Sequence, residues 1–158
     1  MEPNIEYLQP MFSFGPSTRH IAVPRRGLRR LEGMVADVLV SGSHVAIYVP
    51  EGTDPIYSAG NARGRVVAVV KLLPLPSGHR MEDYTYNDPF TGHVRWCFGY
   101  LCETLILPPI NHCPYLRTNF NLLFSGPFQP YVSRLQLGPF RLEPAMRDQL
   151  NQDFRSFS

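Results

Sequence analysis

Arginine is the residue type in this sequence with the clearest chemical use. Fourteen of the fifteen basic residues are arginines, Lys71 is the single lysine, and five arginines fall between Arg19 and Arg30. A guanidinium group is planar and carries its donors in a fixed fork, so it can grip phosphate oxygens and stack on nucleobases. Phosphate binding is therefore one interpretation. A codon bias toward arginine, or an ordinary solvated face, would produce the same pattern.

Two more arginine groups lie in segments that could form a binding site. Arg63 and Arg65 flank a glycine, and in the C-terminal half Arg117 and Arg134 accompany Asn119. We predict that these four arginines contact phosphate. The formal net charge of the chain is only +2. A low net charge suits few phosphate contacts and a modest salt dependence of binding.

The cysteines and histidines do not follow a metal-binding pattern. Cys97 and Cys102 are five residues apart on an expected strand, so their side chains point to opposite faces, and His112-Cys113 adds no CxxC pair. No GxSxG, HExxH or phosphate-loop motif occurs. His93 or His112 near Cys113 could form a nucleophile–base pair, although a buried thiol explains the same residues. We therefore predict no metal, no cofactor and no catalytic residue.

Composition indicates one domain in a reducing compartment. A chain of 158 residues with 44% hydrophobic residues can bury a real core. An odd number of cysteines, three, fits a reducing compartment better than a disulfide scaffold. The N-terminus has no basic region of the secretory type, and no run of about 18 apolar residues predicts a membrane span. We expect a cytoplasmic protein that does not enter the membrane.

The middle of the chain predicts the wall of a small curved sheet. Residues 44–49 alternate and predict a strand with one apolar face. After a turn, residues 56–59 continue as strand, and residues 65–73 form the longest β-branched run. A run that is apolar on both faces is typical of the centre of a sheet. Gly60 and Gly64 interrupt the segment and allow another molecule to approach the backbone closely.

The rest of the chain supplies flanking elements and two long connections. The expected elements are an N-terminal arm at residues 1–17, a strand at 19–23, a helix with an apolar stripe at 28–39 and a stop at 41–42, a strand at 93–107 bent at Gly99, a short strand at 132–137, and a helix at 144–154 held by Met146, Leu150 and Phe154. The connections 74–92 and 108–130 are long and turn-rich. Loops of this length in compact domains are often binding loops or lids.

This order of elements resembles the PUA-like superfamily, particularly its EVE and ASCH-type domains. The resemblance covers roughly residues 18–154 and rests on HVAIYVPEG, on IYSAGNARGRVVAVVKLL and on SRLQLGPFRLEPAMRDQL. It implies an α+β fold: a small, curved, mostly antiparallel β-barrel with a few short flanking helices, formed by residues 18–158 behind the arm. The chain departs from the family where RHIAV lacks the tryptophan often found there and where connection 108–130 is long.

The resemblance also implies a barrel pocket that holds a modified or flipped base of DNA or RNA. The residues expected to bind the base are Tyr48, Tyr57, Asn61, Trp96 and Asn119. Ordinary core packing would also explain the aromatic residues, and a left-handed turn position would also explain Asn61. Stacking is worth about 1–3 kcal/mol per base, and extruding a base from a duplex costs a few kcal/mol. Hydrogen bonds and phosphate contacts would then supply the net affinity.

Three functions remain open from the sequence. The first is a non-catalytic nucleic-acid-binding module that recognises a modified or flipped base. The second is a small hydrolase acting on an amide or nucleoside-like substrate on the same barrel, for which Lys71 within an apolar strand is the candidate group. The third is a small-ligand or protein-interaction domain. A lysine at a strand end can also simply extend its charged head into solvent.

Overall fold

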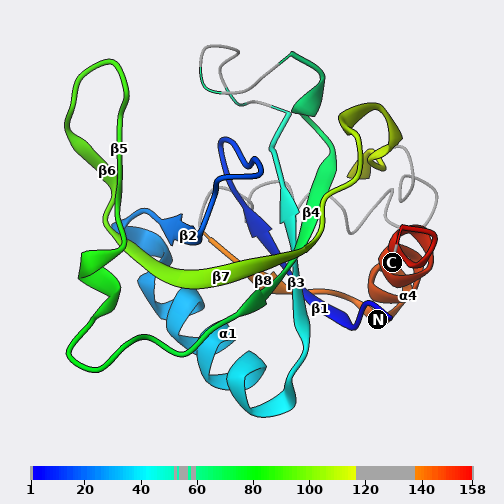
Figure 1. Cartoon of the computed structure of the whole chain (residues 1–158), viewed down its shortest axis with the longest axis horizontal. Helices are drawn as coiled ribbons and strands as arrows, with labels where there is room; N and C mark the ends of the chain where they lie inside the picture. Colours follow the sequence, from blue (N-terminus) through cyan, green and yellow to red (C-terminus); the bar gives the residue numbers. More distant parts are fainter. Residues whose placement is uncertain (1, 52, 54–56, 58–59, 117–137, 158) are drawn as a thin grey trace.

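The central strands of the fold are apolar on both sides because a helix covers each face of the sheet. The computed structural model describes residues 2–51, 53, 57, 60–116 and 138–157 (Figure 1). It is an α+β fold with one six-stranded sheet in the order β2-β7-β4-β3-β1-β8. The strands are β1 (Ile5–Pro10), β2 (His20–Val23), β3 (His44–Tyr48), β4 (Val66–Leu72), β7 (Phe98–Ile106) and β8 (Phe140–Arg141). All neighbouring strands pair antiparallel except β1 and β3, which are parallel.

The expected mostly antiparallel sheet is confirmed, but the expected barrel is not closed in the described part of the chain. The sheet there has two edges, β2 and β8. β7 changes partner along its length: residues 98–101 pair with β2 and residues 102–106 pair with β4. This switch curves the sheet without joining its ends. The strand expected at 132–137 lies outside the described residues.

The expectation for β4 is confirmed, whereas that for β3 needs a correction. β4 lies between β7 and β3, in the centre of the sheet, as its β-branched run predicts. β3 was expected to have one apolar face, but all five of its residues are buried. Val45 and Ile47 pack into the core beneath helix α1 (Leu28–Ser41), and Ala46 and Tyr48 pack into the core beneath helix α4 (Pro144–Arg155). The alternation of polar and apolar residues did not predict burial of both faces, because His44 and Tyr48 are polar in type but buried in the structure.

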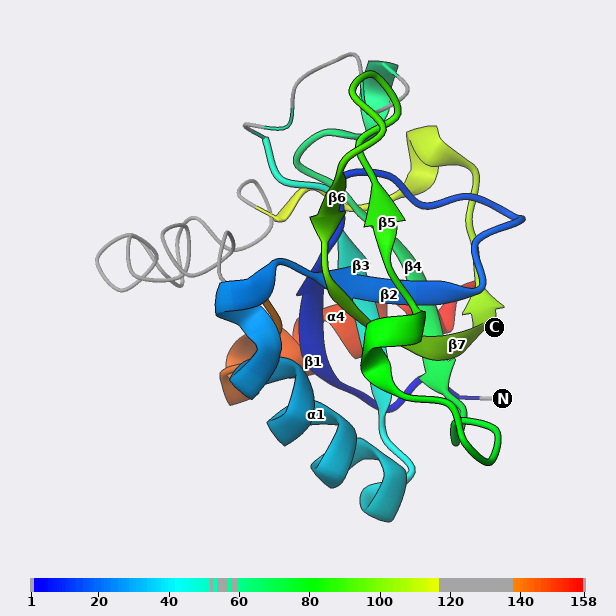
Figure 2. The same ribbon diagram turned by 90° about the vertical axis from the view of Figure 1, so that its left-hand side faces the viewer.

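Two helices form where the sequence predicts them. α1 (Leu28–Ser41) buries Leu31, Met34, Val35 and Val38 against the sheet and ends where Gly42 adopts a φ of 72°. α4 (Pro144–Arg155) buries the three residues expected to hold it. The two helices contribute to separate apolar cores on the two faces of the sheet (Figures 1 and 2). Short 3-10 helices occur at Arg25–Gly27 (η1), Gly60–Ala62 (η2), Met81–Asp83 (η3) and Ile110–His112 (η4).

The N-terminal arm expected at residues 1–17 contains an interior strand, β1. β1 lies between β3 and β8, with Ile5 and Leu8 fully buried. The sequence did not predict this strand because a polar residue, Gln9, is also fully buried in it. The Gln9 amide donates to the carbonyl of Ala22 at 3.1 Å and to that of Pro10 at 2.9 Å. These bonds satisfy the side-chain nitrogen of Gln9 and tie β1 to β2, whereas its side-chain oxygen has no hydrogen-bond partner among the described residues.

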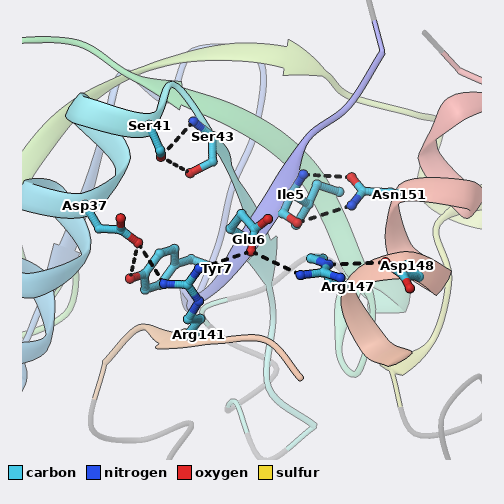
Figure 3. A network of polar contacts seen from close by, with 10 residues as sticks. All are labelled: Ile5, Glu6, Tyr7, Asp37, Ser41, Ser43, Arg141, Arg147, Asp148 and Asn151. Carbon is cyan, nitrogen blue, oxygen red and sulfur yellow. Dashed lines mark hydrogen bonds and ion pairs between the residues drawn. The ribbon is translucent and has the colours of Figure 1, made fainter. Parts of the chain in front are cut away.

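A polar network fastens β1 to the elements around it (Figure 3). The Arg141 guanidinium on β8 lies 3.7 Å from Glu6 and 3.2 Å from Asp37 of α1. Asn151 of α4 accepts a hydrogen bond from the Ile5 amide at 2.7 Å and donates to the Ile5 carbonyl at 3.2 Å. Both helices are thereby linked to the same strand.

The strand expected at 93–107 divides at Cys97. Residues before it form β6 (Val94–Trp96), which pairs with β5 (Tyr86–Asn87) as a separate hairpin, and β7 begins after it. This hairpin stands out from the six-stranded sheet (Figure 2). The 74–92 connection, expected to be a loop, therefore contains η3 and β5. None of the helices in the described part of the chain has the length and apolar character needed to cross a bilayer.

Candidate functional site

Two of the aromatic residues predicted to bind a base, Tyr57 and Trp96, meet around a third ring, Phe12. The Phe12 and Trp96 rings stack with centroids 4.2 Å apart and 12° between their planes. Tyr57 meets Phe12 edge-on at 6.1 Å. Tyr86 of β5 and Phe90 of the hairpin turn complete the group. We call this group the aromatic cluster, consisting of Phe12, Tyr57, Tyr86, Phe90 and Trp96.

A guanidinium group lies over the aromatic cluster. The central carbon of Arg95 is 5.6 Å from the Tyr57 ring centroid and 5.3 Å from that of Trp96. The same side chain is 56% exposed and lies 3.4 Å from an Asp88 carboxylate oxygen. A cation over an aromatic face is attracted by the ring quadrupole. Arg95 is thus held in place while part of its surface remains open to solvent.

Asp88 organises the hairpin turn from inside. One carboxylate oxygen accepts from the Phe90 and Thr91 amides at 2.9 and 3.3 Å, and the other accepts from the Tyr57 hydroxyl at 2.8 Å. The bond from the Phe90 amide, followed by that from Tyr57, lowers the pKa of Asp88. The bond to Asp88 raises the pKa of Tyr57. Asp88 is 7% exposed and shapes the turn.

The turn presents apolar side chains outward. The Asp88 amide donates to the His93 carbonyl and the Gly92 amide donates to the Asp88 carbonyl, both at 2.8 Å. With these bonds made, Phe90 is 63% exposed and Val94 is 54% exposed. Phe90 and Val94 thus form an exposed apolar pair on the same hairpin.

The base of the hairpin is fastened to β2 through His20. The His20 ring stacks on Tyr86 at 4.1 Å with 8° between the planes, and its Nε2 lies 3.1 Å from the Thr85 carbonyl. The Tyr86 hydroxyl donates to the His20 carbonyl at 2.8 Å. Burial raises the pKa of Tyr86 to about 12 and lowers the pKa of His20. Both groups are therefore neutral at pH 7, which suits a buried stacked pair.

The other residues predicted to bind a base do not join the cluster. Tyr48 is 3% exposed and packs in the core beneath α4, so it does not face an opening. Asn61 is exposed and donates to Asn111 at 3.4 Å. No non-glycine residue in the described part of the chain has a positive φ, so Asn61 does not occupy a left-handed turn position. Asn119 lies outside the described residues.

Arg65, predicted to contact phosphate, has a structural position instead. It is 9% exposed and donates to the Asn61 carbonyl at 2.7 Å, the Cys113 carbonyl at 3.0 Å and the Tyr115 hydroxyl at 2.6 Å. Its donors are thus engaged within the protein. Arg63 is exposed. Arg117 and Arg134 lie outside the described residues.

Gly64 does not provide the opening that the sequence suggested. Its φ is +80°, and a Cβ atom there would lie 2.9 Å from the side chain of Glu51. The glycine is needed for the turn and for the close approach of Glu51. The side chain of Glu51 occupies the space in which the sequence predicted the approach of another molecule.

The cysteines behave as packed thiols. Cys102 and Cys113 are buried, and the Cys113 thiol lies 3.6 Å from the Pro109 carbonyl. No group of three metal-binding side chains occurs among the described residues. Burial raises the pKa of Cys102 to about 12 and also raises that of Cys113.

We expect only one of the three thiols to react in the folded protein at pH 8. Cys97 is partly exposed, whereas the other two are buried and protonated at that pH. Titration with a chromophoric disulfide reagent should count one thiol in buffer and three in denaturant. Cys97→Ser should abolish the native signal. Rapid native reaction of two or three thiols would contradict the burial of Cys102 and Cys113.

Five of the groups that build this site were missed by sequence reasoning: Phe12, Tyr86, Asp88, Phe90 and Arg95. The available signal was the unusual length of the 74–92 connection, which contains three of them. Comparison of the chain with protein-family models, with curated proteins and with solved structures finds no match.

Proposed function

We propose that the protein is a nucleic-acid-binding module without chemistry of its own, which holds a modified or flipped base at the aromatic cluster. One observation carries the proposal. Arg95 is 56% exposed while it lies over the rings of Tyr57 and Trp96, and Phe90, which meets Tyr57, is 63% exposed. Aromatic rings and guanidinium planes are the surfaces on which unstacked bases stack.

The same contacts suggest which groups would touch the base. One face of Trp96 is covered by Phe12, so Trp96 supports the site. Phe90 and Arg95 offer the exposed surfaces. Stacking on one ring is worth about 1–3 kcal/mol, comparable with the cost of extruding a paired base. The site therefore favours a base that is already unpaired, as in a single strand, or weakly paired because of a modification.

We also propose that the fold is an opened relative of the PUA-like barrel. The order of β2, α1, β3 and β4, followed by a long curved β7 and a final helix, supports this. The base site would then lie on the hairpin attached to the sheet and not in a barrel pocket.

Protein interaction is the second candidate. The apolar pair Phe90 and Val94, exposed on the same hairpin, favours it. The hydrolase alternative has less support, because Lys71 is exposed on β4 and, within the described residues, its side chain forms no hydrogen bond with a histidine or threonine.

We expect Phe90→Ala and Arg95→Ala each to weaken binding of single-stranded oligonucleotides about tenfold, because each removes a stacking surface. Binding can be followed by fluorescence of Trp96, the single tryptophan, which lies within the cluster. A panel of modified and unmodified oligonucleotides should reveal the preferred base.

Phe157→Ala is the matched control, since Phe157 is an exposed aromatic residue after α4 and outside the cluster. It should bind like the unmodified protein. Unchanged affinity of both hairpin variants, in proteins that remain folded, would remove the cluster from nucleic-acid binding. A partner protein captured only when Phe90 and Val94 are both present would support the second candidate.

A further inference from the structure

We propose that the η1–α1 arginine surface, formed by Arg25, Arg26, Arg29 and Arg30, binds the phosphate backbone of the nucleic acid. That the bound anion is a nucleic acid rests on the proposed function. The arginine surface itself is separate from the aromatic cluster. The sequence has a high density of arginines in this region, and the proposed function gives these arginines no role. Three observations of the structure support the assignment.

The first observation is that these arginines have no side-chain partners among the residues that the structure describes. Arg25, Arg26 and Arg29 are exposed and Arg30 is half-buried. Within the described residues, none of the four side chains forms an ion pair or hydrogen bond. Arg141, in contrast, has carboxylate partners (Figure 3).

The second observation is that the four charges are placed where they disfavour the helix. They lie at and before the first turn of α1, where the helix dipole is already positive. Arg29 and Arg30 lie within that turn, and Arg25 and Arg26 lie on the 3-10 helix η1 that immediately precedes it. The first turn of α1 contains no acidic residue to offset them. Folding therefore gives no reason for this arrangement, whereas binding an anion does.

The third observation is that the start of α1 adds the positive end of the helix dipole to the four charges. The amides of Gly27 and Leu28 already donate to the carbonyls of Pro24 and Arg25, so the attraction for an anion comes from the dipole and the guanidinium groups. Together these form a strongly positive surface at the end of β2, the strand that also anchors the hairpin (Figure 2).

A nucleic acid fits this surface better than an anionic membrane does. An amphipathic helix binds a membrane by inserting its apolar face among the lipids. The apolar face of α1, including Leu31, Met34 and Val38, is buried against the sheet and cannot insert. Arginine also matches phosphate geometry through two parallel hydrogen bonds, which suits a chain of regularly spaced phosphates.

The test compares two double variants by the salt dependence of oligonucleotide binding. Each single-strand phosphate contact contributes about 0.7 to the slope of log K against log salt concentration. Arg25→Gln/Arg29→Gln should therefore lower that slope by about 1.4. The matched control, Arg80→Gln/Arg155→Gln, removes two exposed arginines that have carboxylate partners elsewhere, and should leave the slope unchanged.

A second measurement does not depend on nucleic acid. Removing like charges from the start of α1 should leave the melting temperature of Arg25→Gln/Arg29→Gln unchanged or higher, because those charges oppose the helix dipole. A lower melting temperature would show that the arginines stabilise the fold, and would overturn the inference.

Three further outcomes separate this inference from the proposed function. An unchanged slope in Arg25→Gln/Arg29→Gln, with weakened binding by Phe90→Ala, would overturn the arginine surface alone. A reduced slope with no effect of Phe90→Ala would support the arginine surface and overturn the aromatic site. Arginine-dependent binding to phosphatidylserine vesicles, without binding to oligonucleotides, would overturn the nucleic-acid assignment.

Discussion

Gly99→Ala is expected to destabilise the protein by about 3 kcal/mol, at the upper end of the range for overpacking substitutions. A Cβ atom at Gly99 would overlap the carbonyl oxygens of Tyr84 and Ile21. Both obstacles are backbone atoms, so no side-chain rotation can relieve the overlap. Either β7 must separate from β2, or the segment leading to the β5–β6 hairpin must move away.

Urea unfolding followed by Trp96 fluorescence would measure this effect, because Trp96 lies on β6. Gly33→Ala is the matched control. Gly33 lies inside α1 with open space where a Cβ atom would be placed. That substitution should stabilise the protein by up to about 1 kcal/mol through helix propensity. Equal stability of the two variants would contradict the close approach described at Gly99.

Arg65→Ala is expected to cost about 3 kcal/mol of unfolding free energy. The substitution leaves the carbonyls of Asn61 and Cys113 without their charged donor and removes the guanidinium from the Tyr115 ring, 4.0 Å away. Hydrogen bonds to charged groups contribute about 1.5–3 kcal/mol, and buried acceptors left without donors carry a desolvation penalty. Arg65→Lys should restore only part of the loss, since one ammonium cannot reproduce the fork.

Arg63→Ala provides the comparison, because Arg63 is exposed two residues earlier. Its unfolding free energy should change by less than about 0.5 kcal/mol. Chemical denaturation of the three variants would decide the point. If Arg65→Ala kept full stability and instead lowered the salt dependence of oligonucleotide binding, Arg65 would be a phosphate contact and not a structural one.

The Gly99 prediction concerns how a hairpin separate from the main sheet is held against that sheet. Gly99 allows the chain before β5 to lie against β7, and His20 fastens Tyr86 to β2. The Asp88 turn then fixes Phe90 and Arg95 relative to the rings beneath. A binding surface that is ordered before the ligand arrives loses less conformational entropy on binding.

Sequence reasoning identified the site only in part. It singled out Tyr57 and Trp96, which both contact the ring of Phe12 in the structure. It missed Phe12, because that residue lies in a segment without periodicity. It also selected Tyr48 and Arg65, which are buried. Residue type shows what a side chain can do, but solvent exposure depends on elements that are distant in the sequence.

By itself the sequence determined the local elements whose residues repeat with a regular period: the apolar stripe of α1, the final helix α4 and the central strand β4. Their hydrophobic spacing is a local property and needs no partner to be recognised. Tertiary structure alone decided that residues 5–10 form an interior strand and that residues 94–96 leave the main sheet. Strand pairing and burial are set by long-range contacts, which no single segment of sequence contains.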